Sequence, residues 1–442
     1  MTIEEWKLKY NKSKPYSHFD KRVSISNVWS YISDPKKVSQ HGFYPFIHYT
    51  INFNKYNKEA GIKQKKREIY YASHIDRCIY QYYAFLLNEA YNKRVIKDNI
   101  NDVSVAYRNN LGKSNIDFSK SAFDFIRKSD SCYIMVGDFT NFFDKLDHKY
   151  LKKQICSLLE THSLPDDYYA VFKNITHYSS WNLVDLLEIN GLQNDKHGRH
   201  DLNSLPTVLS LKQFNKLKNL YIHPNTNKYG IPQGSPISAV LANIYMLEAD
   251  KTINDYVRQL NGLYMRYSDD FIVILPVGQS DFHIHYEWIK NFLSTVDGVV
   301  LSPEKTQLYL YDHNSIISCN NTFEANVSNG KNMLNFLGFS FNGKEVTIRD
   351  KTISKYYYRL YRKAKTISND AFMTPKGNRI SCKNLYDQYS IKGATKNGGN
   401  FISYVYRANK AYNGTEPIDR STKNHMFKIR KALNKPPKKK FE

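Results

Sequence analysis

Two adjacent carboxylates, Asp269 and Asp270, are the residues whose types and spacing most directly indicate chemistry. They follow Ser268 and lie between two largely apolar or aromatic runs, 264–267 and 271–275, which predicts a β-hairpin with the polar residues near its bend. Neighbouring carboxylates repel each other, and this raises the pKa of at least one of them unless a cation is present. Magnesium prefers carboxylate oxygen, so we expect a metal site here. The alternative is a surface turn between two strands.

A third carboxylate, Asp138, ends another apolar run, 132–137, which reads as a buried strand. If both strands belong to one antiparallel sheet, Asp138 meets Asp269 and Asp270. Three carboxylates can hold two magnesium ions about 3.5–4 Å apart, the arrangement that serves in-line phosphoryl transfer. One ion activates an attacking hydroxyl, and the other neutralises a triphosphate and its leaving group.

The elements that must position these carboxylates follow from apolar periodicity and turn residues. A basic run at 63–71 leads into a strand, and Asp147 is a plausible N-terminal cap. Loops are expected at 190–206, as a polar insertion, and at 230–236, which is rich in Gly and Pro and precedes a helix. Further helices are expected at 76–91, 121–127, 147–159, 281–296 and 352–367, and further strands at 299–311 and 333–341.

Composition narrows the class of partner. The chain has 442 residues and a formal charge of +23, from 64 Lys and Arg against 41 Asp and Glu, which favours a polyanion over a generically basic protein surface. Aromatic residues make up 14% of the chain, and their rings can stack on unpaired bases, so we expect nucleic acid.

Composition also indicates the compartment. No apolar run reaches the roughly 18 residues of a membrane span, and the N-terminus lacks the features of a signal peptide. The five cysteines are scattered without Cys-x-x-Cys spacing, which argues against disulfides and zinc and favours a reducing cytoplasm.

The chain resembles reverse transcriptases, because five motifs occur in that family's order over about residues 63–342. They are Gly137-Asp138-Phe139-Thr140-Asn141-Phe142-Phe143-Asp144 (motif A), Gly230-Ile231-Pro232-Gln233-Gly234-Ser235-Pro236-Ile237-Ser238 (B), Tyr267-Ser268-Asp269-Asp270 (C), Ser302-Pro303-Glu304-Lys305-Thr306 (D) and Phe336-Leu337-Gly338-Phe339 (E). Upstream, Arg67-Glu68-Ile69, Asp76-Arg77 and the loop at Arg108 resemble the motifs of the fingers.

The resemblance implies a role for each matching residue. The two Mg²⁺ ions would be held by Asp138, Asp269, Asp270 and the carbonyl of Phe139, with Lys305 as a proton donor near the leaving pyrophosphate. The deoxynucleoside triphosphate would meet Lys65, Arg67, Phe143, Gln233 and Gly234. The primer and template would meet Tyr267, Phe336, Leu337, Gly338 and Arg108. The rival readings are a solvated basic run for Lys65 and Arg67, a surface lysine for Lys305 and ordinary core packing for Phe336.

The implied fold is α+β, a right-hand polymerase with fingers, a palm built on an antiparallel sheet and a helical thumb. We expect an N-terminal segment and fingers at 1–130, palm at 131–160, fingers or an insertion at 161–228, palm at 229–342, and thumb with a basic tail at 343–442. The basic, Tyr-rich helix at 352–367 suits a duplex minor groove, or is a packed helix with a solvated face. The lysine-rich tail at 435–440 is expected to be disordered.

The implied activity is RNA-directed DNA synthesis. Phe143 stands where RNA-copying RNA polymerases carry a second aspartate that reads the ribose 2′-hydroxyl, so deoxynucleotides are favoured. A different class of function also stays open, an RNA-binding protein with an idle polymerase site.

The resemblance is strongest to the stand-alone, defence-associated bacterial enzymes, class 2, related to abortive-infection reverse transcriptases. A retron enzyme would carry Asn-Ala-x-x-His and Val-Thr-Gly, whereas this chain has Val346-Thr347-Ile348; a group II intron enzyme would continue into further domains. We therefore expect cDNA made from a dedicated noncoding RNA in anti-phage defence, with untemplated or protein-primed synthesis as the alternative. The aromatic and basic segment from Trp6 to Tyr49 would select the template. The oligomeric state is not encoded in any motif.

Overall fold

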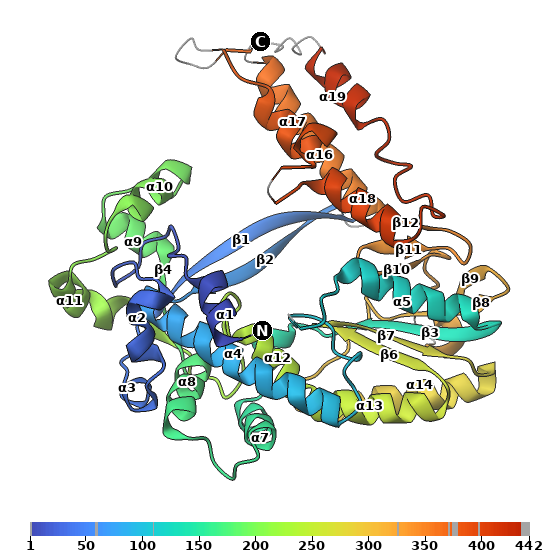
Figure 1. Cartoon of the computed structure of the whole chain (residues 1–442), viewed down its shortest axis with the longest axis horizontal. Helices are drawn as coiled ribbons and strands as arrows, with labels where there is room; N and C mark the ends of the chain where they lie inside the picture. Colours follow the sequence, from blue (N-terminus) through green and yellow to red (C-terminus); the bar gives the residue numbers. More distant parts are fainter. Residues whose placement is uncertain are drawn as a thin grey trace.

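The computed structural model describes residues 2–57, 61–108, 110–324, 327–369, 372–373, 379–396 and 398–434. Figure 1 shows three bodies: a sheet covered by helices at the right, a mostly helical body at the left, and a helical arm at the top. The expected disordered tail at 435–440, and Asn109 in the loop after Arg108, lie outside the described residues.

A five-stranded sheet forms the body at the right of Figure 1. All its strand pairs are antiparallel. Its order is β6 (Leu263–Tyr267), β7 (Asp270–Leu275), β3 (Ser131–Asp138), β8 (Gln307–Asp312) and β9 (Ser315–Ser318).

Both faces of this sheet are buried, which explains the continuous apolar runs of β3 and β7. Alternate residues such as Tyr133 and Val273 pack in one core cluster with α13 (Leu247–Gln259) and α14 (Gln279–Ser294). The residues between them, such as Ile134 and Ile272, pack in another with α5 (Asn115–Lys128). Figure 1 shows α5 on one side of the sheet and α13 with α14 on the other.

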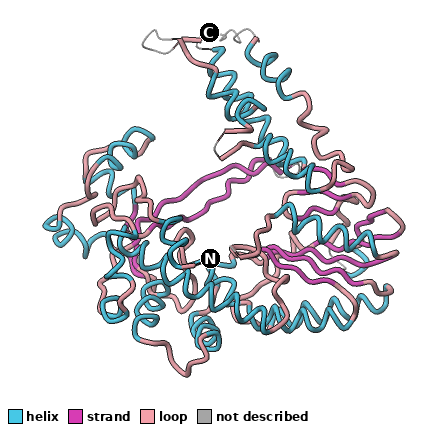
Figure 2. The backbone as a smooth tube through the Cα atoms, in the orientation of Figure 1, coloured by secondary structure: helices cyan, strands magenta, loops and turns pink. Residues whose placement is uncertain are grey.

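The body at the left carries a second sheet, ordered β2 (Gly61–Tyr71), β1 (Phe46–Asn57), β4 (Ser179–Asn182) and β5 (His223–Pro224). The β1–β2 pair continues as a long two-stranded ribbon away from the rest of this sheet (Figure 2). Helices surround the sheet: α1 (Ile3–Tyr10), α2 (Ile25–Ile32), α3 (Pro35–Ser39), α4 (His74–Lys97), α8 (Asp166–Thr176), α9 (Leu183–Ile189), α10 (Lys196–Ser204) and α11 (Leu211–Tyr221).

The expected loop at 190–206 is partly wrong, because it contains α10. Asp195 caps this helix by accepting from the Gly198 N–H, and Leu202 is buried in a cluster with Trp181. The chain also forms α6 (Phe142–Lys145), α7 (His148–Leu158) and α12 (Ser238–Tyr245). Asp147 caps α7 as predicted, accepting from the Tyr150 N–H at 2.8 Å.

The arm begins at a small sheet of β10 (Leu334–Phe336), β11 (Phe339–Phe341) and β12 (Val346–Ile348). It continues through α16 (Asp350–Asn369), α17 (Lys383–Tyr389), a 3₁₀ turn (Ile391–Gly393), α18 (Phe401–Ala411) and α19 (His425–Leu433). A core of its own holds the arm together, with Leu360, Leu385, Ile402 and Ile429 fully or almost fully buried.

Two strand predictions were too long. The expected strand 333–341 is a hairpin, because Leu337 and Gly338 adopt positive φ angles of 46° and 91° and reverse the chain. The expected strand 299–311 begins only at Gln307, because Ser302–Lys305 forms a turn in which the Lys305 N–H donates to the Ser302 carbonyl at 3.1 Å. The short helix α15 (Asn320–Phe323) follows β9 in the chain.

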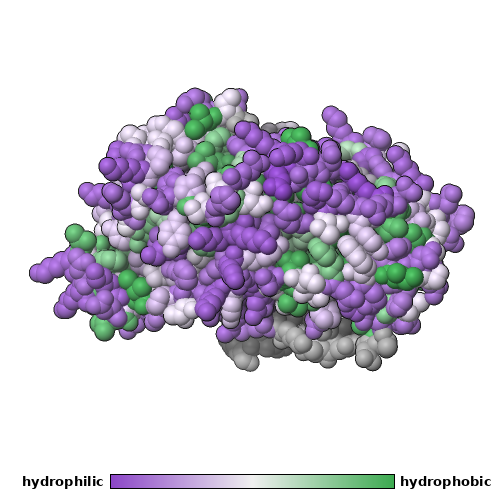
Figure 3. Space-filling view, turned by 90° about the horizontal axis from the view of Figure 1, so that it is seen from below, coloured by the Kyte–Doolittle hydropathy of each residue, from purple (hydrophilic) through white to green (hydrophobic). Residues whose placement is uncertain are grey.

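The described surface is largely polar. Figure 3 shows one face of the molecule as mostly hydrophilic, with hydrophobic side chains in separate groups. Among the described helices, none is both long enough and apolar enough to cross a membrane. The five cysteines all carry free thiols.

Replacing Gly137 with alanine should destabilise the sheet. A Cβ atom at Gly137 would lie 2.3 Å from Cζ of the Phe271 ring, which pairs with it across β3 and β7. Overpacking of this kind costs about 1–3 kcal/mol, measured as the free energy of unfolding in urea. Gly42→Ala is the matched control, because a Cβ there has no neighbour within 4 Å. Equal stability of the two variants would contradict this packing.

Candidate functional site

Strand register brings the three predicted carboxylates to one end of the central sheet. Asp138, the last residue of β3, pairs with Asp270, the first residue of β7. The Phe139 N–H donates to the Asp269 carbonyl at 3.1 Å, which fixes the turn between β6 and β7 beside the end of β3. Ser268 turns the chain there with a φ of 63°. The hairpin predicted from the sequence is confirmed.

The cluster is electrostatically crowded. Removal from water, followed by the nearby Asp269 and Asp138 carboxylates, raises the pKa of Asp270 to about 7. Lys305 offsets part of this charge, because its ammonium group forms an ion pair with Asp138. The segment that carries Lys305 is tied to the same strand end, since the Ser302 N–H donates to the Asp138 carbonyl at 2.8 Å.

The residues at this strand end suit magnesium by their chemistry. Neighbouring carboxylates gain from a divalent cation, and their hard oxygens are the ligands Mg²⁺ prefers. Asp138, Asp269, Asp270 and the Phe139 carbonyl would hold it. Within the described part of the chain, however, no three His, Cys, Asp or Glu side chains are already grouped to hold a metal. The Lys305 ammonium is paired with Asp138 instead, so metal binding requires that pair to open.

A buried ion pair fixes the turn between β6 and β7 from the interior of the protein. Arg266 and Asp250 are both inaccessible to solvent, and the guanidinium donates to both carboxylate oxygens at 2.8 and 2.6 Å. Its remaining nitrogen donates to the Ser268 carbonyl at 2.8 Å, one residue before Asp269. Tyr264 and Ser104 complete the network. Sequence reasoning missed this pair, because Asp250 lies on α13 and nothing in its local pattern marks it as the partner of a strand residue.

A cavity of about 610 Å³ opens beside the carboxylates. It brings together all five residues predicted to bind the nucleotide, from β2, from the start of α6 and from the loop before α12: Lys65, Arg67, Phe143, Gln233 and Gly234. Phe139, Asp269 and Lys305 line it as well.

The loop before α12 is held rigidly at the cavity wall. The Tyr70 N–H donates to the Gln233 carbonyl at 2.9 Å. Gly234 has a φ of 119°, and a Cβ there would lie 2.4 Å from the Tyr70 carbonyl, so only glycine fits. Asp144, the last residue of motif A, also lines the cavity, where it accepts a hydrogen bond from the Gln233 amide at 3.2 Å.

Arg108 lies away from the cavity. Its side chain points into the protein and is bound by Asn92 at 3.0 Å and by the Asn101 side chain at 2.6 Å. The preceding residue, Tyr107, is exposed and lines the cavity instead. The prediction that Arg108 meets primer or template therefore finds no support in this geometry, because both ends of its guanidinium are held within the fold.

The other predicted primer contacts gather near the β10–β11 hairpin. Phe336 is buried in the core cluster that includes α5, against which Tyr267 and Leu337 also pack. Gly338 forms the turn, and the adjacent Leu337 carbonyl accepts from the Asn115 side chain at 2.9 Å. None of these four residues lines the cavity beside the carboxylates.

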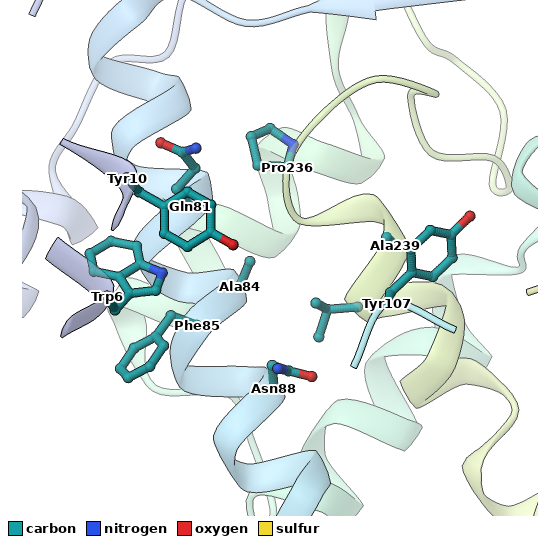
Figure 4. Close-up of a pocket in the computed structure, with 10 residues that line it drawn as sticks. Trp6, Tyr10, Gln81, Ala84, Phe85, Asn88, Tyr107, Pro236 and Ala239 are labelled. Carbon is teal, nitrogen blue, oxygen red and sulfur yellow. The ribbon is translucent and has the colours of Figure 1, made fainter. Parts of the chain in front are cut away.

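Most rings of the N-terminal segment pack in or against the core. Trp6, Phe19 and Phe46 are 3%, 7% and 2% exposed, so ordinary packing describes them. Tyr10 is half-buried and lines a second cavity of about 260 Å³, between α1, α4 and the start of α12 (Figure 4).

Comparison with known proteins identifies a family over most of the chain. Residues 57–341 match the family described as reverse transcriptase (RNA-dependent DNA polymerase). No curated protein matches the chain. The family match, with the mixed helix and sheet architecture, confirms the predicted α+β, right-hand polymerase fold class. The domain boundaries remain predictions.

Solved structures of telomerases are also similar. One is apo telomerase from Candida tropicalis truncated from the C-terminal domain, with a TM-score of 0.43, 15% identity, and 74% of this chain and 61% of that chain covered. Another is telomerase from Candida albicans in complex with a TWJ fragment of telomeric RNA, with a TM-score of 0.39, 13% identity, and 88% and 57% covered. This chain therefore spans less than two thirds of either length, and TM-scores below 0.5 add nothing to the family match.

Proposed function

Since this chain belongs to the reverse transcriptase (RNA-dependent DNA polymerase) family, we propose that it extends a primer with deoxynucleotides on an RNA template. The observation that carries the proposal is the convergence of Asp138 with Asp269 and Asp270, fixed by the pairing of β3 with β7. The cavity beside them is lined by basic side chains from β2, which suits a triphosphate.

Each residue of the site has a role in this proposal. Asp138, Asp269, Asp270 and the Phe139 carbonyl would hold the metal, which when bound would supply positive charge at the primer 3′-hydroxyl and at the triphosphate. Lys65 and Arg67 hold the phosphates. The Lys305 ammonium group, which pairs with Asp138, would be available to the leaving pyrophosphate if a metal ion took its place on that carboxylate.

An RNA-binding protein with an idle site is the second reading. The crowding of the three carboxylates argues against an idle site, because like charges at a strand end lower stability unless a bound cation neutralises them. Burial first, and then the charges of Asp269 and Asp138, raise the pKa of Asp270.

The double substitution Asp269→Ala with Asp270→Ala should abolish magnesium-dependent incorporation of labelled deoxynucleotides, because it removes two of the three metal-binding carboxylates. RNA binding and the thermal midpoint should be retained, since relief of repulsion offsets the lost contacts. The control is Asp102→Asn, whose carboxylate is 77% exposed and pairs with Arg258. Full activity in the double variant would remove the catalytic assignment.

Phe143 is placed to exclude ribonucleotides. Its half-buried ring lines the same cavity as Gln233 and Lys65, and it packs at 5.8 Å from the ring of Phe142. A ring held in this way cannot move aside easily, so a 2′-hydroxyl would clash with it. Because the clash disfavours ribonucleotides, we expect the product to be DNA.

Phe143→Ala should raise the incorporation of ribonucleotides relative to deoxynucleotides by roughly tenfold or more, because a steric clash of a few kcal/mol disappears. The ratio of kcat/KM for the two substrates on one primer and template measures the effect. Wild-type protein that uses both substrates equally well would refute the steric role.

We further propose that the protein is a bacterial, cytoplasmic, defence-associated enzyme of the class 2 type, which makes cDNA from a dedicated noncoding RNA. The support is the resemblance of motifs A to E and the charge of +23, which suits a polyanion. The N-terminal segment contributes Tyr10 to a cavity that adjoins the catalytic one, while most of its other rings pack in or against the core. Untemplated or protein-primed synthesis is the alternative.

Sequencing of the nucleic acid that copurifies with the protein from cells should yield one dominant small RNA and its complementary DNA. A dedicated template predicts this result because selection by a structured partner excludes other transcripts. A broad sample of cellular transcripts, or DNA of random sequence, would reject the dedicated template while leaving the polymerase activity intact.

A further inference from the structure

Tyr107 occupies the boundary between the two cavities. It lines both the catalytic cavity and the second cavity of Figure 4, as does Ala239 of α12. Its side chain is 48% exposed although the preceding residues are buried. Its φ angle is 61°, a left-handed conformation that is strained for a tyrosine.

The loop around Tyr107 is anchored on both sides, which maintains this strained conformation. The Val105 N–H donates to the Arg266 carbonyl at 3.0 Å, and the Asn243 side chain donates to the Ala106 carbonyl at 2.9 Å. Arg108 is held by Asn92. The buried arginine therefore serves to present the tyrosine ring outward.

The tyrosine also contacts the catalytic turn. Its hydroxyl donates to the Ser268 hydroxyl at 3.2 Å, and Ser268 directly precedes Asp269. The Ser268 carbonyl is fixed by Arg266 at 2.8 Å. A ring that lies at the mouth of one cavity is thus bonded to the residue that sets the position of a metal-binding carboxylate.

The lining of the second cavity suits a neutral, flat group. Tyr10 and Phe85 lie on one wall and Pro236 and Ala239 on the other, with Tyr107 at the edge (Figure 4). None of the described lining residues is charged, so the cavity does not suit a phosphate. Gln81 accepts from Arg77 at 2.7 Å through its amide oxygen, which leaves its amide nitrogen as a donor for a base edge. Rings and amides of this kind recognise unpaired or stacked nucleobases.

We propose that Tyr107 is the nucleic-acid contact of this loop: its ring stacks on a template nucleobase that enters the second cavity, and its hydroxyl positions the catalytic turn through Ser268. The inference rests on the proposed function and deepens it. The template strand is the occupant because the hairpin expected to grip the primer, β10–β11, packs against α5, whereas this cavity lies between α1, α4 and α12.

Two substitutions separate the two roles of Tyr107. Tyr107→Phe keeps the ring and removes the hydroxyl, whereas Tyr107→Leu removes the ring at a similar backbone strain. The matched control is Tyr169→Leu, because Tyr169 is 45% exposed on α8 and lines neither cavity.

The probe is an RNA template annealed to a DNA primer that ends in a dideoxynucleotide, with 2-aminopurine at one template position at a time. We expect the fluorescence of 2-aminopurine to be quenched at one template position by the wild-type protein, by Tyr107→Phe and by the control variant. In Tyr107→Leu the quenching should disappear, and template binding should weaken at least about fivefold, as loss of one base–aromatic stack predicts.

Steady-state extension of an unblocked primer completes the test. Tyr107→Phe should lower kcat about three- to tenfold with unchanged template affinity, the worth of one hydrogen bond, while Tyr169→Leu changes neither. Quenching that persists in Tyr107→Leu, or unchanged kcat in Tyr107→Phe, would overturn the assignment. Wild-type protein that quenches the probe but never extends a primer would instead refute the proposed function and leave the base contact standing.

Discussion

The register of β3 against β7 is the constraint on which the site depends. It sets Asp138 opposite Asp270, and a shift by one residue would turn every side chain of the strand to the other face of the sheet. The sheet therefore specifies the position of the carboxylates through its apolar core rather than through any attraction between them. Burial, followed by the neighbouring Asp269 and Asp138 carboxylates, raises the pKa of Asp270 at this position.

The neighbours of this strand end all act to hold the charge in place. Lys305 forms an ion pair with Asp138, and the N–H of Ser302, three residues earlier, donates to the Asp138 carbonyl. Arg266 and Asp250 support the turn from the interior. Removing two charges from water costs free energy, so this buried ion pair is weak evidence for a gain in stability. Its bonds to the Ser268 carbonyl and to Ser104 give it a clearer role in fixing the turn's geometry.

The cavity beside the carboxylates is assembled from segments far apart in the sequence. The β1–β2 ribbon brings basic side chains, the start of α6 brings Phe143, and the loop before α12 brings Gln233. The hydrogen bond from the Tyr70 N–H to the Gln233 carbonyl joins the ribbon to that loop. The N-terminal helix α1 reaches the same region by packing Trp6 on Phe85 of α4, with ring centroids 5.2 Å apart.

The sequence by itself determined the features that depend on neighbouring residues. The hairpin at Ser268, the cap at Asp147 and the order of motifs follow from local patterns, because turn chemistry and periodicity act within a few residues. The tertiary structure decided what depends on distant segments. Burial of Arg108 and exposure of Tyr107 come from Asn92, Asn243 and Arg266, which no local pattern links to that loop. The pairing of Arg266 with Asp250 and the meeting of Asp138 with Asp270 likewise required the folded sheet, because only packing brings remote charges into contact.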